Sequence, residues 1–309
     1  MSDINPRVDI AFKKIFGTEE NKDLLISLIN SIVGEADQVS EVTLLNPYNP
    51  KNFKTDKLSI LDIKATGRDG KRFNVEIQVS DEADYDKRAL YYWAKLYSEQ
   101  LKSTENYSLL CKAIGIHILN FTSIPEVKKY HNIFHITEKE NGSVYFKDLE
   151  LHTIELKKFI DTSNGKSEEL DNMMLKVKNS LDLWTAFLIR HDLINTKKLP
   201  KGVDATSVEK AIEVLEVMNF TEEERDAYEG RLKWLRIEAS SLKKASTEGE
   251  ARGMKKGIEL GIEKGIELGI EKGIEKVAQN MLFKLHLDLD TVQKATGLTK
   301  EELQKIIKK

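Results

Sequence analysis

The chain has 309 residues, of which 40% are hydrophobic and 32% charged, and these proportions are normal for a globular protein. Its formal net charge of -3 excludes a generally basic protein that coats nucleic acid, so any nucleic-acid surface has to be a local patch. The single cysteine, Cys111, excludes an internal disulfide framework. With no apolar run of membrane-spanning length and no visible signal peptide, we expect a cytoplasmic protein without membrane contact.

Helices are predicted over residues 8–16 and 21–33, where apolar side chains recur at helical spacing, and a strand is predicted over residues 42–45. The first helix follows the start signal Asn5-Pro6 and ends at a glycine. Asp9 lies in its first turn, where a carboxylate stabilises the positive end of the helix dipole.

The stretch 58–80, LSILDIKATGRDGKRFNVEIQVS, indicates two strands joined by a tight turn. Apolar and polar side chains alternate over residues 58–65 and 73–79, as they do in strands. Between the two runs lies RDG, and an Asp-Gly step is a strong hairpin signal.

The length of this turn decides which side chains share a face. A two-residue loop would place Asp62 opposite Ile77, whereas a three-residue loop with Gly70 in the left-handed conformation places Asp62 opposite Glu76. The longer loop also puts the apolar residues of both strands on one face, and a slip by one residue would mix polar and apolar residues on each face. The hydrophobic pattern therefore predicts the three-residue loop.

In that register Asp62, Glu76 and Gln78 lie on one face of the hairpin. Adjacent cross-strand side chains are about 5 Å apart at Cβ, so the two carboxylates can share one hard divalent cation. Two acids and an amide on the solvated face of an amphipathic hairpin are also ordinary. Spacing alone leaves both interpretations open.

A helix is predicted over residues 84–103, with cations and aromatic side chains at steps of three and four residues. Packed beside the acidic face, it would direct Arg88 or Lys95 toward a phosphate and Tyr91 or Tyr92 toward a sugar or base. The alternative is that the aromatic side chains belong to the core and the cations are solvated.

Residues 113–121 (AIGIHILNF) predict a central strand, and residues 130–136 and 144–156 predict two more. His131 and His135 are four apart, but on a strand that spacing is too long for joint chelation, and no further ligand completes a zinc set. The sequence contains no phosphate-binding loop, so we expect no nucleotide cofactor.

From residue 166 the chain is predicted to be helical and highly charged, with helices over residues 170–189 and 207–218 and a third from Thr221. Thr221 and Glu224 form a capping box at the start of the third helix. We expect residues 1–165 to form the core domain and residues 166–247 a helical lid or arm.

Residues 248–276 form a repeat with glycine at every fourth position, as in GIELGIEKGIELGIEKGIEK (257–276). Glycine costs about 1 kcal/mol relative to alanine in a helix, so seven of them cost roughly 5–7 kcal/mol. A close-packed partner helix would offset that cost, which predicts a self-association arm in a homo-oligomer. A spacer expanded by slippage is the alternative, so a helix and a linker both stay open. The glycines are Gly249, Gly253, Gly257, Gly261, Gly265, Gly269 and Gly273.

Residues 277–309 predict a small helical end similar to a helix-turn-helix, with Thr299 and Glu302 capping the last helix. Lys294 and Lys300 would then meet phosphates. A plain packing module of helices is the alternative.

Several of these segments together carry a family resemblance. Asp62, followed by Glu76-Ile77-Gln78, resembles the motif of the PD-(D/E)xK nuclease superfamily, whose last motif residue is usually lysine. With glutamine there, the chain resembles the Rpn-type recombination-promoting nucleases and the PD-(D/E)xK nuclease family transposases. The segments 9–17 (DIAFKKIFG) and 88–97 (RALYYWAKLY) and the Gly-Ile-Glu tail are similar to the same branch.

The resemblance implies an α/β fold with a restriction-endonuclease-like PD-(D/E)xK core, in which helices flank a mixed sheet, and a helical C-terminal extension. It implies a metal-dependent DNA endonuclease that uses Mg²⁺ or Mn²⁺ and is associated with mobile elements or genome defence. The alternative is a catalytically weak nuclease fold that acts as a DNA-binding or self-associating scaffold.

The same resemblance implies roles for individual residues. Asp62 and Glu76 would hold the metal, with the Ile77 carbonyl and Asp9 as further ligands. Gln78 would orient water or phosphate, because its amide does not titrate and cannot act as a general base. Lys95 or Arg88 would balance charge in the transition state.

Overall fold

The structure is a computed structural model that describes residues 4–48, 63–82, 84–159, 170–192, 194, 199–200 and 202–308. The chain divides into two compact units, Met1–Arg236 and Ile237–Lys309, and each is described by itself. Within the described residues, no helix is both long and apolar enough to cross a lipid bilayer.

The first unit is built on a mixed sheet with the strand order β1-β2-β3-β4-β6-β5. β3 pairs in parallel with β4, and β4 pairs in parallel with β6, while the other neighbours are antiparallel. β4 is buried along its whole length, as its apolar sequence predicts. The strands are β1 (Val42–Leu44), β2 (Ile63–Gly67), β3 (Arg72–Gln78), β4 (Ala113–Leu119), β5 (His131–Thr137) and β6 (Val144–Glu155).

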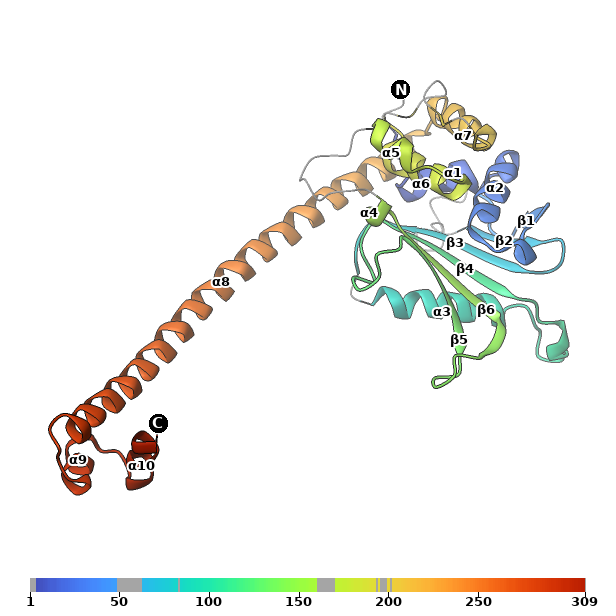
Figure 1. The fold of residues 1–309 in the computed structure, drawn as a ribbon. Coiled ribbons are helices and arrows are strands. Elements are labelled where there is room, and N and C mark those ends of the chain that lie inside the picture. The colour runs from blue at the N-terminus through green and yellow to red at the C-terminus, as the bar shows by residue number, and fades with distance from the viewer. Residues whose placement is uncertain are drawn as a thin grey trace. The chain divides into compact units, whose positions relative to one another are not determined.

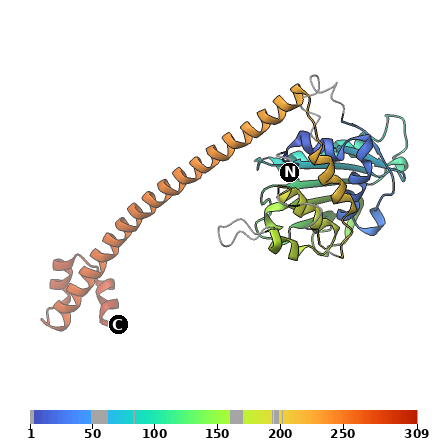
Figure 2. The same ribbon diagram turned by 90° about the horizontal axis from the view of Figure 1, so that it is seen from above.

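Helices cover both faces of this sheet, so the predicted fold class is confirmed (Figure 1). α3 (Tyr85–Ser98) lies on one face. The opposite face carries α1 (Asp9–Phe16), α2 (Lys22–Ile32), α5 (Leu170–Lys176), α6 (Ser180–Arg190) and α7 (Thr206–Glu216). Seen from above, the blue helices α1 and α2 lie beside the yellow-green and gold helices (Figure 2). Shorter helical segments are α4 (Leu156–Phe159), η1 (Glu19–Asn21), η2 (Glu35–Asp37) and η4 (Tyr107–Leu109).

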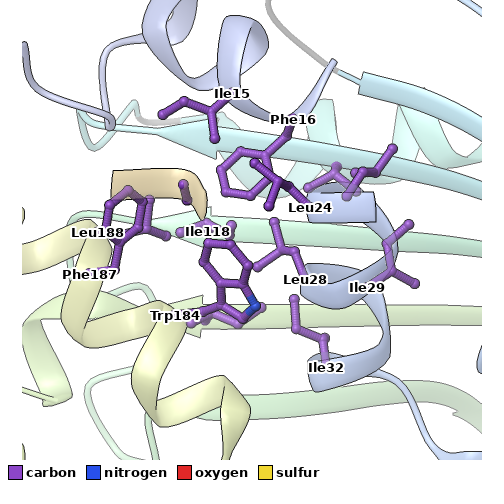
Figure 3. Close-up of a cluster of buried hydrophobic side chains, with 14 of the residues drawn as sticks. Ile15, Phe16, Leu24, Leu28, Ile29, Ile32, Ile118, Trp184, Phe187 and Leu188 are labelled. Carbon is purple, nitrogen blue, oxygen red and sulfur yellow. The ribbon is translucent and has the colours of Figure 1, made fainter. Parts of the chain in front are cut away.

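The main hydrophobic core lies between the sheet and the helices on the α1 and α2 side. Trp184 packs edge-on against Phe16 and Phe187, and Leu28 and Ile118 close the same cluster (Figure 3). All five side chains are buried, and burial of one such side chain contributes about 1.5–3 kcal/mol. The core therefore fixes which face of β3 points inward.

The turn between β2 and β3 is the three-residue loop that the hydrophobic pattern predicts. Gly67 N donates to Lys71 O at 2.9 Å, and Gly70 has φ +86°. Ile63 then pairs with Val75. The sequence prediction that Asp62 lies opposite Glu76 uses this register, but Asp62 itself falls outside the described residues.

One helix prediction is wrong. A single helix was expected over residues 170–189, but α5 ends at Lys176 and α6 begins at Ser180. Asn179 causes the break, because its side-chain oxygen accepts a hydrogen bond from Asp182 N at 2.9 Å and caps α6. The helix predicted over residues 84–103 ends at Ser98.

α8 (Glu222–Phe283) is a helix of 62 residues that includes the whole glycine repeat. Its predicted capping box is present, since Thr221 N donates to Glu224 Oε2 at 2.8 Å and Glu224 N donates to Thr221 Oγ1 at 3.3 Å. A Cβ added at each repeat glycine would meet no atom within 4 Å.

The second unit ends in a small module of three helices. α9 (Leu289–Thr296) and α10 (Lys300–Lys308) pack with the end of α8 around Ala278, Val292, Leu303 and Ile306. Gly297 has φ +77° and ends α9, and the predicted Thr299 and Glu302 capping box starts α10. The predicted domain boundaries at residues 165, 247 and 276 stay predictions.

Candidate active site

Glu76 lies in the middle of β3, on the sheet face that α3 covers. Its register partner on β4 is His117, and paired residues of parallel strands point to the same face. Only 7% of Glu76 is exposed, and Gln78, two residues further along the same face, is 5% exposed. The fold thus places a carboxylate and an amide side by side in a largely buried position.

Arg88 of α3 joins these two side chains. Its Nη2 lies 3.2 Å from Glu76 Oε1 and 2.9 Å from Gln78 Oε1, and donates to both, while its Nη1 donates to Glu82 Oε2 at 2.6 Å. Gln78 Nε2 donates in turn to Glu82 Oε1 at 2.9 Å and to the Ser80 carbonyl at 3.1 Å. Arg88 therefore brings a positive charge beside Gln78, where the sequence motif itself has none.

His117 is a site residue that the sequence reasoning missed. Its Nδ1 shares a hydrogen bond of 2.8 Å with Tyr85 Oη and lies 3.8 Å from Glu76 Oε2. Burial, reinforced by the charge of Arg88, lowers the pKa of His117 to about 4, so the ring is neutral at pH 7. The neutral imidazole therefore packs beside the Glu76 carboxylate without placing a positive charge next to it.

Gly115 makes room for the His117 ring. A Cβ at Gly115 would lie 3.0 Å from His117 Nε2 and 2.6 Å from Leu151 Cδ2. The glycine in the motif AIGIHIL therefore allows the side chains of His117 and Leu151 to approach it closely over the sheet. This signal is visible in the sequence, but the partner strand has to be known before it points to Glu76.

Asp9, in the first turn of α1, pairs with a residue from far along the chain. Its Oδ2 lies 3.3 Å from Arg231 Nε of α8, and the Asp9 side chain is 5% exposed. Burial raises the pKa of Asp9, and the charges of Arg231 and, more weakly, Arg88 oppose that shift. Arg88 is thus near both acids of the described site.

The described donors suit a hard divalent cation, which prefers carboxylate and carbonyl oxygens. Asp9 Oδ1 is buried and accepts no hydrogen bond from any described residue, so its lone pairs are available. Within the described ranges, no three or more His, Cys, Asp or Glu side chains are arranged to hold a metal ion. Asp62, which the sequence assigns as a ligand, lies outside those ranges.

The other predicted site residues take different positions. The side chain of Ile77 belongs to the core on the opposite face, which leaves only its carbonyl as a ligand. Lys95 is about half exposed and lies 3.6 Å from Glu99, and Tyr91 is 63% exposed with its ring against Tyr92.

The two lysines predicted to contact phosphates belong to the second unit. Lys294 is exposed on α9, and Lys300 pairs with Asp290 at 2.7 Å. Their role in binding phosphate stays a prediction.

The comparisons with known proteins fit this geometry. A family model described as PD-(D/E)XK nuclease family transposase matches residues 6–245. No curated protein and no solved structure matches the chain.

Proposed function

Because the chain belongs to the PD-(D/E)XK nuclease family transposases, we propose that it is a metal-dependent endonuclease that hydrolyses phosphodiester bonds in DNA. The observation that supports this proposal is the contact of Glu76, Gln78 and Arg88 on one buried sheet face. It combines a ligand carboxylate, a neutral polar group and a cation within hydrogen-bond distance. A role in genome defence or in a mobile element, and a cytoplasmic location, belong to the same proposal.

Asp62 and Glu76 would hold Mg²⁺ or Mn²⁺, with the Ile77 carbonyl and Asp9 as additional ligands. Such a cation, when bound, lowers the pKa of its water and offsets negative charge on the phosphate. Burial suits Asp9 to this role, because a buried carboxylate gains more from a neighbouring cation than a solvated one.

Two polar side chains would orient the reactants and balance the charge of the transition state. Gln78 presents an amide that orients the attacking water or a phosphate oxygen without exchanging a proton. Arg88 donates to Glu76 and Gln78 in the free protein, and its planar fork also matches phosphate geometry. We assign Arg88, rather than Lys95, to charge balance in the transition state, since Lys95 pairs with Glu99 instead of with Glu76.

A plasmid-cleavage assay with Mg²⁺, Mn²⁺ or EDTA tests the proposal. Wild type should cut only with a divalent cation, and Asp62→Ala and Glu76→Ala should each lose the activity. Glu99→Ala is the matched control, because Glu99 is an exposed acid at the end of α3 and should leave cleavage unchanged. Cutting in EDTA, or cutting that survives both substitutions, would contradict the assignment.

A second candidate function, self-association, is favoured by the surface of α8. The repeat isoleucines Ile258, Ile262, Ile266 and Ile270 are each 57–59% exposed. These isoleucines are four residues apart, so each is displaced by about 40° around the helix from the one before. They therefore form a stripe that winds around α8 instead of lying along one side of it. We propose a homo-oligomer whose contacts follow this winding stripe, in a chain whose nuclease fold is intact.

A further inference from the structure

The Arg231 side chain has N–H donors that make no hydrogen bond to any described residue. Its Nε lies 3.3 Å from Asp9 Oδ2, but no described residue accepts a hydrogen bond from this nitrogen. A guanidinium has five N–H donors in a rigid fork. About a quarter of the Arg231 side chain is exposed, so an incoming ligand can reach these donors without unfolding α8.

Trp234 lies one turn further along α8 and holds this guanidinium in place. The Arg231 guanidinium carbon lies 4.4 Å from the centroid of the Trp234 ring, which is a cation–π contact. Trp234 is 42% exposed, whereas Trp184 is 1% exposed and the Trp93 indole donates to the Ala113 carbonyl. Of the three tryptophans in the chain, Trp234 is the one whose exposed ring contacts an arginine that pairs with a candidate active-site acid.

A guanidinium next to an exposed indole is a combination that recognises nucleotides. The guanidinium binds a phosphate through paired N–H donors, and the indole stacks on a base. In a duplex both faces of each base are already stacked, so the indole suits an unpaired base. Arg231 pairs with Asp9, so a phosphate held by Arg231 would lie at the candidate active site.

We infer that Arg231 and Trp234 form a binding site for an unpaired segment of DNA, with Arg231 on a phosphate and Trp234 stacked on a base. This inference rests on the proposed function for its choice of DNA as the ligand. It goes further by assigning the substrate a single-stranded region and by placing a part of α8 in the active site.

A competing explanation is that the two side chains only stabilise the helix surface. Residues three apart on a helix are neighbours, and such pairs contribute a few tenths of a kcal/mol. That explanation accounts for the contact with Trp234 but not for the position of Arg231 against a buried carboxylate on α1. It also predicts no effect of either residue on DNA affinity.

Binding of fluorescein-labelled DNA, measured by anisotropy in EDTA, separates the two explanations because it needs neither metal nor cleavage. The probes are a short oligothymidylate, a blunt duplex and a duplex with an overhang. The variants are Arg231→Ala, Trp234→Ala and Trp234→Phe. Arg236→Ala is the matched control, since Arg236 is an exposed arginine about 140° around the same helix.

For oligothymidylate and the overhang, Trp234→Ala should raise Kd about 5- to 100-fold, as loss of one stacked base predicts. Trp234→Phe should retain most of the affinity, because phenylalanine also stacks. Arg231→Ala should weaken binding and lower the slope of log K against log salt concentration by about 0.7. Arg236→Ala and the affinity for blunt duplex in Trp234→Ala should match wild type.

The inference is overturned if Trp234→Ala binds oligothymidylate as wild type does, if Arg236→Ala has the same effect as Arg231→Ala, or if wild type binds no DNA. Binding and cleavage together distinguish failure of this inference from failure of the proposed function. Metal-dependent plasmid cleavage with unchanged binding in Trp234→Ala would remove only the inference. Stacking-dependent binding without metal-dependent cleavage would remove only the nuclease assignment.

Discussion

Arg88 Nη2 lies 3.2 Å from Glu76 Oε1, so the carboxylate assigned as a metal ligand already has a cationic partner in the free protein. Asp9 Oδ2 likewise lies 3.3 Å from Arg231 Nε, as an ion pair without a hydrogen bond. Each pair neutralises a buried acid that would otherwise be costly to keep charged. A divalent cation bound at the proposed site would therefore compete with two guanidinium groups, and its binding would free both of them to contact phosphate.

The first prediction concerns this competition. Arg88→Ala should bind Mn²⁺ roughly 3- to 10-fold more tightly than wild type in calorimetry, because an ion pair to Glu76 no longer opposes binding. The same variant should lose about 100-fold in cleavage rate, since the transition state loses a cation. Arg88→Lys should regain part of the rate. Equal Mn²⁺ affinity in Arg88→Ala and wild type would show that the arginine does not compete.

The second prediction concerns the space over Gly115. Gly115→Ala places a methyl group 2.6 Å from Leu151 Cδ2 and 3.0 Å from His117 Nε2. Overpacking of this kind costs about 1–3 kcal/mol, which urea denaturation measures. Gly34→Ala is the control, because Gly34 has φ -68° and a Cβ there meets no atom within 4 Å. Unfolding of the two variants at the same urea concentration would contradict a close approach of side chains over Gly115.

The third prediction is that stability falls in mild acid. The folded pKa of His117 is about 4, below the unfolded value near 6.5, so the unfolded chain binds the proton first as the pH drops. The contribution is fully present above about pH 6.5 and is lost as the pH falls toward 4. Between about pH 7 and pH 5 one such group changes the unfolding free energy by about 2 kcal/mol.

Substitution isolates the part due to this histidine. His117→Gln removes the titrating group, so the difference in unfolding free energy between the two pH values should shrink by about 2 kcal/mol. His131 and His191 have pKa values lowered to about 4 as well, chiefly by burial, so some dependence should remain. An unchanged dependence in the variant would mean that His117 titrates normally in the folded state.

The fourth prediction concerns Glu224, which links the start of α8 to α1. Its carboxylate accepts from Lys14 Nζ at 2.7 Å and from Tyr48 Oη, and its side chain is 1% exposed. Glu224→Ala leaves Lys14 without this partner and should cost about 3–5 kcal/mol of unfolding free energy. Glu222→Ala, an exposed acid in the same turn, should cost less than about 1 kcal/mol. Similar urea midpoints for both variants would refute the role of the buried pair.

The fifth prediction tests self-association through α8. Replacing Gly257, Gly261, Gly265 and Gly269 by alanine meets no steric obstacle within 4 Å. Helicity measured by circular dichroism should rise, because each replacement favours the helix by about 1 kcal/mol. Because the proposed contacts are made by the exposed isoleucines, sedimentation should show that the oligomer persists in this variant. Dissociation despite the more stable helix would assign the contacts to close approach at the glycines instead.

Local patterns were sufficient for much of the fold. The Asp-Gly step and the alternation around it predict the loop in which Gly70 has φ +86°, because both signals lie within a few residues of the turn. The capping boxes at Thr221 and Thr299 were predicted for the same reason. The break at Asn179 was missed because the apolar spacing continues across it, and the asparagine cap competes with that spacing.

Contacts between distant segments were not predictable from patterns. His117 faces Glu76 only because β3 and β4 pair in parallel, and the register of a parallel pair is set by packing rather than by a turn. Arg231 looks like one of many charged residues on a long helix until α8 packs against α1. The candidate metal ligands and Arg88 could be proposed from the sequence, whereas the pairing of Arg88 with Glu76 and the role of Arg231 required the three-dimensional structure.

Asn5 N donates a hydrogen bond of 2.7 Å to Tyr228 Oη across 223 positions of the chain. Proteins emerge from the ribosome N-terminus first, so α1 is made long before the segment that completes its surroundings. Asp9 gains Arg231 only after the first turns of α8 have been translated. A prematurely terminated chain would thus lack both this pair and the anchor of α1. If the chain is the DNA endonuclease proposed above, such late assembly would confine its activity to chains that have been synthesised past Arg231.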